Sequence, residues 1–263
     1  FLPMHGGRSL FERTALRHKA IGLAAPWIVC GEHDRFQVQD GLDAIEMREA
    51  TIVTEPVARN TAPAIAVVAE LLVRQDPEAV MFVLPSDHLV TPDAAYFTTV
   101  ETALREAAAG RMVTFGVVPT FPETGYGYIK AAPGEAAVRK VERFVEKPPV
   151  DEAARMMSEG NYYWNAGFFA FSARAMLDEL ATTAPEVVEA AKAAADHAAR
   201  SGSTIVLPAA QFGSAPDISI DYALFERTDK AAVAPISCGW SDVGSWRAYW
   251  ETLDKDEAGN AIR

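Results

Sequence analysis

Apolar and polar positions along the first 120 residues alternate between short apolar runs and longer amphipathic segments. The short runs are rich in β-branched residues and predict strands at residues 26–30, 51–54, 80–84 and 112–118. The longer segments have apolar side chains at helical spacing and predict helices at residues 62–75 and 94–109. Strands that alternate with helices are typical of an α/β fold whose central strands are buried on both faces.

After Gly125 the apolar segments become shorter. They predict strands at residues 126–130, 138–145 and 167–171, and helices on both sides of Pro185. We therefore predict one α/β domain over residues 1–263. Its Rossmann-like central sheet is mixed, mainly parallel and flanked by helices, and a smaller, partly antiparallel lobe holds the substrate.

Composition and charge narrow the classes of function. The chain has 263 residues, of which 49% are hydrophobic and 23% charged, as in globular proteins. Uncharged apolar stretches such as residues 61–69 are too short to span a bilayer. A net charge of −12 disfavours nucleic acid and anionic lipid as partners. We expect no membrane association, a cytoplasmic location without a secretory signal, and inert thiols at Cys30 and Cys238; a homodimer stays open as an assembly.

Two aspartates are candidate metal ligands. Asp87 follows the predicted strand at 80–84, at the carboxyl end where ligands bind in open α/β sheets. Asp242 lies among glycines between Trp240 and Trp246. Carboxylates of this kind can hold Mg²⁺ against a triphosphate. The structural alternatives are that Asp87 caps the following turn and that Asp242 caps a helix that starts near residue 245.

A third candidate segment precedes the predicted helix at 62–75. Either Asn60 or Thr61 is available there as the helix N-cap, and Pro63 fits the first turn. Arg59 beside Asn60 offers a fork of donors and an amide that suit an anion or the edge of a purine. A solvated Arg near a helix cap is the competing interpretation.

Three further motifs in the second half suit a sugar phosphate. Gly125 lets the backbone approach a ligand closely while Tyr126 packs over it, although a tight turn explains the motif equally well. Glu146 can accept hydroxyl groups and Lys147 can bind phosphate, unless the two form an exposed ion pair. An amide and a glycine beside aromatic residues, at Asn165 and Gly167, can bind a sugar or can simply begin a strand.

In this order the motifs resemble the nucleotidyltransferase domain of the mannose-1-phosphate guanylyltransferases over essentially the whole chain. The resemblance rests on residues 55–64, 84–89, 115–129, 144–148, 162–167, 219–222 and 239–246. The run from Arg59 to Pro63 favours the guanylyl, mannose-directed branch of such enzymes.

The resemblance implies an enzyme that needs Mg²⁺ and makes GDP-mannose and pyrophosphate from GTP and mannose 1-phosphate. Residues up to about 120 would bind the nucleotide, and residues 121–263 would bind the sugar. The roles implied for single residues are as follows: Asp87 and Asp242 hold the metal; Arg59, Asn60 and Pro63 lie by the base; Gly125, Tyr126, Glu146, Asn165 and Gly167 bind the sugar; Lys147 binds its phosphate and counts with Asp87 and Asp242 as catalytic.

Members of the family carry segments that we expect to lie outside these 263 residues. One is a Gly-rich loop with an Arg and a Lys ahead of the position of Phe1, and the other is a C-terminal β-helical or isomerase domain. Two alternatives stay open: a nucleotidyltransferase for another base or hexose, and a catalytically silent subunit that binds a nucleotide sugar.

Overall fold

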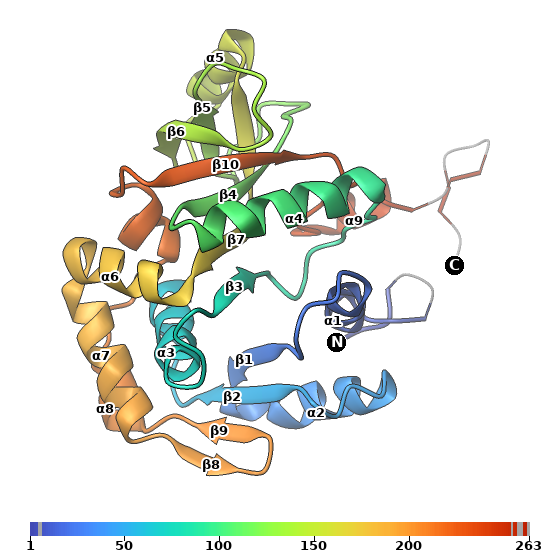
Figure 1. Cartoon of the computed structure of the whole chain (residues 1–263). Coiled ribbons are helices and arrows are strands. Elements are labelled where there is room, and N and C mark those ends of the chain that lie inside the picture. Colours follow the sequence, from blue (N-terminus) through green and yellow to red (C-terminus); the bar gives the residue numbers. More distant parts are fainter. Residues whose placement is uncertain (5–6, 254, 257–259, 262–263) are drawn as a thin grey trace.

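The structure is a computed structural model that describes residues 1–4, 7–253, 255–256 and 260–261. It is an α/β fold with two separate sheets (Figure 1). The strands are β1 (Trp27–Gly31), β2 (Thr51–Glu55), β3 (Val80–Val83), β4 (Met112–Val117), β5 (Tyr128–Ala131), β6 (Arg139–Val145), β7 (Tyr162–Ser172), β8 (Ala199–Ser201), β9 (Thr204–Val206) and β10 (Ala231–Ile236).

Helices surround both sheets. The strands and helices predicted for the first half of the chain are confirmed, and each observed end lies within two residues of the predicted one. The α-helices are α1 (Leu10–Ala20), α2 (Arg35–Ala44), α3 (Thr61–Val73), α4 (Ala94–Ala108), α5 (Val150–Glu159), α6 (Ala173–Thr183), α7 (Pro185–Asp196), α8 (Ala209–Gly213) and α9 (Trp246–Glu251). A π-helical turn spans Asp221–Phe225. Among the described residues, no helix has both the length and the apolar character needed to cross a membrane.

The smaller sheet has the strand order β1-β2-β9-β8. Strands β1, β2 and β9 are parallel to one another, and β8 returns antiparallel to β9. Helix α2 packs on β1 and β2. On the other side, Val53 of β2 and Ile205 of β9 belong to the main core together with α3 and α7. Residues from the second half of the chain thus extend a sheet that the first half begins.

The larger sheet has the order β3-β7-β4-β10-β6-β5. The long strand β7 pairs with β3 through residues 169–172, with β4 through residues between 164 and 170, and with β5 through residues 162–164. Because β5 also pairs with β6, the strands β7, β4, β10, β6 and β5 pair in a closed cycle. Residues 121–263 therefore contribute to both sheets, and the division at about residue 120 stays a prediction.

The α/β class with mixed sheets is confirmed, but parallel pairs do not predominate. Of the nine pairings between described strands, three are parallel, namely β1–β2, β2–β9 and β4–β10. Helix α4 connects β3 to β4, as in a parallel unit, yet β7 inserts between these two strands and runs antiparallel to both. The sequence pattern identifies strands but carries no information on which later strand separates two earlier ones.

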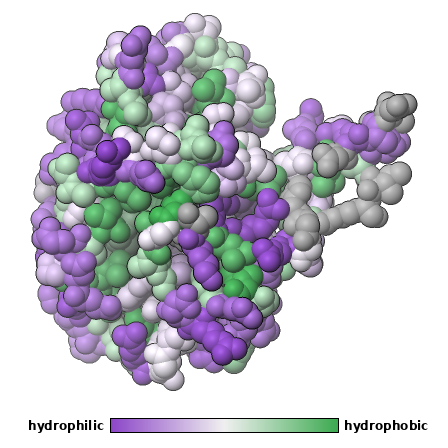
Figure 2. Space-filling model, turned by 45° about the vertical axis from the view of Figure 1, so that its right-hand side comes forward, coloured by the Kyte–Doolittle hydropathy of each residue, from purple (hydrophilic) through white to green (hydrophobic). Residues whose placement is uncertain are grey.

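A groove of about 950 Å³ separates the two sheets. Its walls include residues 27–30 of β1 and residues 80–83 of β3, which face each other across the gap in Figure 1. Its lining is mainly apolar, but Glu55, Arg59, Asn60 and Asp87 also line it. Figure 2 shows apolar side chains gathered in the middle of a face that is otherwise mostly hydrophilic. The groove puts chemistry-bearing residues of β2, α3 and β3 around one space.

Candidate active site

Asp87 and Asp242 come from two segments that run side by side. Leu89 and Ser241 form an antiparallel bridge, with N···O distances of 2.9 and 3.0 Å. Asp87 is two residues from one end of this bridge, and Asp242 is next to the other. The negative charges of both carboxylates act on the ring of His88. The sequence left their proximity open, and the bridge brings the two segments together.

The surroundings of His88 act on its charged form in opposite directions. Burial lowers its pKa, while the charges of Asp87 and Asp242 act in the opposite direction. Trp240 donates its indole N–H to His88 Nδ1 at 3.1 Å. The ring also lies beside Phe168. His88 is thus packed against aromatic side chains and hydrogen-bonded by Trp240.

Asp242 is positioned by Tyr126 and by the shape of the chain around it. Tyr126 donates its hydroxyl proton to Asp242 Oδ1 at 2.6 Å. A Cβ on Gly244 would lie 2.6 Å from Asp242 Oδ2, so a side chain at that position would displace the carboxylate. The interpretation of Asp242 as a helix cap is wrong, because Ser245 caps α9 by accepting from Ala248 N.

Asp87 is exposed and lines the groove. Within the described residues its carboxylate makes no hydrogen bond or ion pair, so the structure does not bear out a turn-capping role. In the described part of the chain, no group of three or more His, Cys, Asp or Glu side chains is arranged so that it could hold a metal ion. Mg²⁺ needs only one or two protein carboxylates when phosphate oxygens complete its shell, and the donor set of Asp87 and Asp242 fits that requirement.

The base-side candidates are largely occupied with structural contacts. Arg59 donates from Nε and Nη2 to the carbonyl oxygen of Gly213, at 3.0 and 2.6 Å. Asn60 has a φ of +64° and caps α3 by accepting from Thr61 N at 2.9 Å, so of the two candidate caps Asn60 is the one used. Pro63 is buried inside α3 and does not line the groove. Arg59 and Asn60 therefore shape the groove wall, and their contact with a base stays a prediction.

Glu55 is a groove residue that its sequence motif does not single out. It ends β2, and its Oε1 is buried without a hydrogen-bond partner among the described residues. Burial raises the pKa of this carboxyl to about 7. The only signal in the sequence is an acidic residue followed by proline at the end of a strand, which is also common in turns.

The sugar-side candidates form a compact cluster on the larger sheet. Asn165 N donates to Gly127 O at 2.8 Å. A Cβ on Gly127 would lie 2.5 Å from Glu146 Oε2 and 3.3 Å from Asn165 Cβ, so a side chain there would displace the Glu146 carboxylate. Lys147, with a φ of +47°, points its amine to within 3.4 Å of Glu146. This is the ion pair of the competing interpretation, and Lys147 is 63% exposed.

Gly167 connects this cluster to the groove. Its φ is +70°, and its N–H donates to Asn165 Oδ1 at 3.1 Å. A Cβ there would lie 3.3 Å from Pro85 and 3.6 Å from His88. Gly125 does not share the contacts of Asn165: its N–H donates to Glu123 Oε1 at 2.8 Å.

The thiols take no part in these contacts. Both cysteines are free, and burial raises the pKa of each to about 11. A protonated thiol is a poor nucleophile and a poor metal ligand.

Comparison with known proteins defines the class. The sequence model of the family described as nucleotidyl transferase matches residues 1–259, and this chain belongs to that family.

Relatives narrow the comparison. The chain is 40% identical over 266 residues to the mannose-1-phosphate guanylyltransferase of Klebsiella pneumoniae. The alignment covers 100% of this chain and 56% of that protein, so this chain spans little more than half the length of the relative. A solved structure described as a mannose-1-phosphate geranyltransferase from Thermus thermophilus is 31% identical, with a TM-score of 0.82 and coverage of 98% of this chain and 73% of that one. A structure described as a mannose-6-phosphate isomerase from Helicobacter pylori matches equally well, at 31% identity and a TM-score of 0.82, over 91% and 93%.

Proposed function

We propose that this chain transfers a guanylyl group from GTP to mannose 1-phosphate, giving GDP-mannose and pyrophosphate. Membership of the nucleotidyl transferase family and the name of the Klebsiella pneumoniae relative support the reaction. The observation that carries the proposal is the Leu89–Ser241 bridge, which brings the segments of two carboxylates together beside the groove.

The transfer needs a divalent cation, and Asp87 and Asp242 are the residues that we expect to hold it. When bound, Mg²⁺ neutralises the charge of the phosphate oxygens that surround the reacting phosphorus. The phosphate oxygen of mannose 1-phosphate attacks the α-phosphorus of GTP, and the bond to the leaving pyrophosphate breaks. Enzymes of this kind contribute mainly by positioning and by electrostatic stabilisation. Lys147 is exposed enough to move from Glu146 to a sugar phosphate.

Glu55 supports a guanine base in particular. Guanine presents adjacent N–H donors at N1 and N2, whereas adenine has no such pair on that edge. A carboxylate with an unsatisfied, buried oxygen is the complementary acceptor. We infer that Glu55 accepts from the guanine edge within the groove, with Arg59 and Asn60 forming the adjacent wall.

Pyrophosphate release from the protein with GTP, Mg²⁺ and mannose 1-phosphate tests the proposal. The parallel reactions contain ATP, UTP or dTTP in place of GTP, and glucose 1-phosphate in place of mannose 1-phosphate. We expect turnover with GTP and mannose 1-phosphate and at least tenfold less with every other pair. Turnover with another pair would change the proposed substrates and leave the assignment as a nucleotidyltransferase intact. Binding of GDP-mannose without turnover would favour the silent subunit.

A further inference from the structure

Asn165 has almost no hydrogen-bonding capacity left for a ligand. Its Oδ1 accepts from Thr114 Oγ1 at 3.0 Å and from Gly167 N at 3.1 Å. Its Nδ2 donates to Asp221 Oδ1 at 2.8 Å. A side-chain amide has two acceptor sites and two donor hydrogens, so a single N–H remains. Whatever Asn165 does for a sugar, it does through that one donor.

Asp221 is held firmly in its place. It opens the π-helical turn, in which Glu226 N donates to Asp221 O at 2.9 Å. Just before it, Ile220 N donates to Thr61 Oγ1 at 2.8 Å, which ties this segment to the first turn of α3. Isolated π-helical turns are uncommon and often occur at functional sites. The segment around Asp221 thus joins the base side of the site to the sugar side.

An ionisable group at this position is unfavourable for stability. Burial is the main cause that raises the pKa of Asp221 to about 6, and the negative charges of Glu146 and Glu226 add to it. The hydrogen bond from Asn165 acts in the opposite direction. No ion pair to Asp221 exists among the described residues. A neutral acceptor would be less costly to bury, so the carboxylate calls for a reason other than packing.

We propose that Asp221 is a positioning residue for the sugar: its carboxylate fixes the amide of Asn165 so that the one remaining N–H faces a hydroxyl of the hexose. This inference rests on the proposed function, because it takes Asn165 as a contact of the sugar. A charged acceptor forms a stronger hydrogen bond than a neutral one and orients the donor more firmly. If the amide turned over, Nδ2 would meet the N–H of Gly167, and Oδ1 would meet the carboxylate of Asp221.

The kinetic constants of Asp221→Ala and Asp221→Asn test the proposal at pH 7.5. In Asp221→Ala the amide loses its partner, and we expect the KM for mannose 1-phosphate to rise about tenfold. The kcat and the KM for GTP should change less than about twofold. Asp221→Asn keeps an acceptor oxygen, so its KM should rise only about threefold. A rise in the KM for GTP as large as that for mannose 1-phosphate would contradict the proposal, and so would an Asp221→Asn as impaired as Asp221→Ala.

A double-mutant cycle separates positioning from direct contact. If Asp221 acts through Asn165, adding Asp221→Ala to Asn165→Ala should change the KM for mannose 1-phosphate less than about twofold. Additive effects would overturn this inference and leave the proposed function intact. If the unmodified protein neither turns over nor binds any sugar phosphate or nucleotide sugar, the proposed function fails, and this inference falls with it. Thermal unfolding of each variant identifies any that has lost its fold.

Discussion

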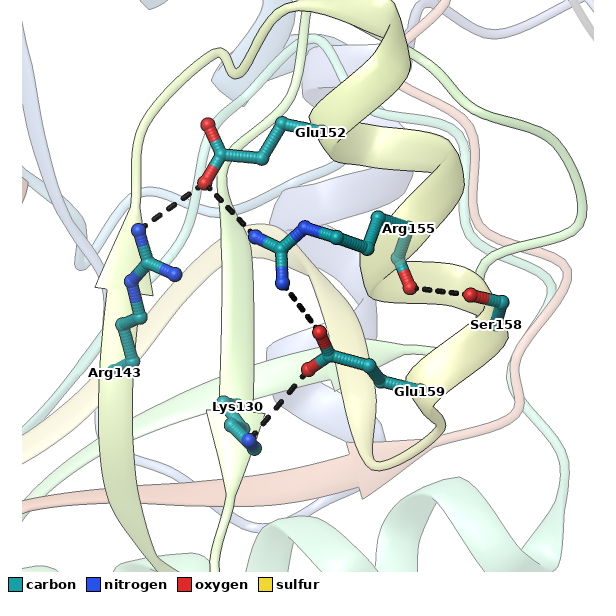
Figure 3. Close-up of polar contacts among 6 residues, drawn as sticks. All are labelled: Lys130, Arg143, Glu152, Arg155, Ser158 and Glu159. Carbon is teal, nitrogen blue, oxygen red and sulfur yellow. Dashed lines mark hydrogen bonds and ion pairs between the residues drawn. The ribbon is translucent and has the colours of Figure 1, made fainter.

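Two groups of carboxylates in this protein have opposite surroundings. On the lobe formed by β5, β6 and α5, each acidic side chain shown in Figure 3 has a basic partner. Glu152 lies 3.1 Å from Arg143 and 3.4 Å from Arg155, and Glu159 contacts Arg155 and lies 3.7 Å from Lys130. In the candidate site, Glu55, Asp87, Asp221 and Asp242 form no ion pair with any described residue.

The difference separates charge used for stability from charge reserved for a ligand. The exposed ion pairs Glu152–Arg143 and Glu159–Lys130 connect α5 to β6 and β5, and each contributes little to stability. Carboxylates without cations repel one another and disfavour the folded state, which natural sites tolerate where function needs them. If the proposed function holds, a site rich in unpaired acids has to accept a polyphosphate, and this requires an added cation.

The largest expected effect comes from removing one unpaired acid. Asp87→Asn should lower kcat for the proposed transfer by at least about a thousandfold, because a carboxylate that holds the metal would be lost. Its melting temperature should stay the same or rise, since a repulsive charge near Asp242 is removed. Pyrophosphate release and thermal unfolding measure the two effects, and chelation with EDTA should abolish turnover of the unmodified protein.

Glu152→Gln is the matched control for this experiment. It also replaces one carboxylate by an amide, but on α5, where the acid is paired. We expect unchanged turnover in this variant. Equal loss of activity in both variants, or full activity in Asp87→Asn, would remove the distinction between the two groups of acids.

A smaller effect is expected at the buried acid of the groove. Glu55→Gln should weaken the binding of GTP about 10- to 100-fold and leave the binding of ATP or UTP almost unchanged. The reason is that the amide N–H₂ of Gln would face one of the guanine N–H donors. Since the pKa of Glu55 is raised to about 7, the carboxylate is mostly protonated at pH 6 and mostly ionised at pH 8. The apparent Kd for GTP should therefore fall about tenfold from pH 6 to pH 8. Calorimetry of GTP binding at pH 6 and pH 8 checks this change in Kd. Glu55→Gln is the control: titration of the GTP phosphate groups contributes equally in this variant, but the pH dependence that comes from Glu55 should be absent.

Local pattern predicted the elements well but not their arrangement. The caps, apolar spacing and strand ends around α3 and β3 are all local features, and these elements agree with expectation. Pairing depends on distant residues: β7 inserts between β3 and β4, and the three-residue β9 joins β2. Neither short strand β8 nor β9 has enough residues to show an alternating pattern.

The position of a site residue was predictable where the residue follows a strand, and not where a distant contact decides its role. Asp87 follows β3 and lines the groove, and Gly167, inside β7, lines it too. The roles of both residues stay predictions. Arg59 offered a free donor fork in the sequence, whereas the folded chain supplies Gly213 O, a residue 154 positions away, as its acceptor. Glu55 and Asp221 are ordinary acids in the sequence, and only burial without a cation distinguishes them.

The smallest expected effect lies on the paired side of the comparison. Arg155→Gln removes the contacts to Glu152 and Glu159. Because these pairs are half exposed, the free energy of unfolding should fall by less than about 1 kcal/mol, and the difference should shrink in about 0.5 M salt as screening increases. Urea unfolding at both salt concentrations measures it, and turnover should be unaffected. A loss of turnover would show that the ion pairs of α5 contribute to the candidate site, and the distinction between the two groups of carboxylates would then fail.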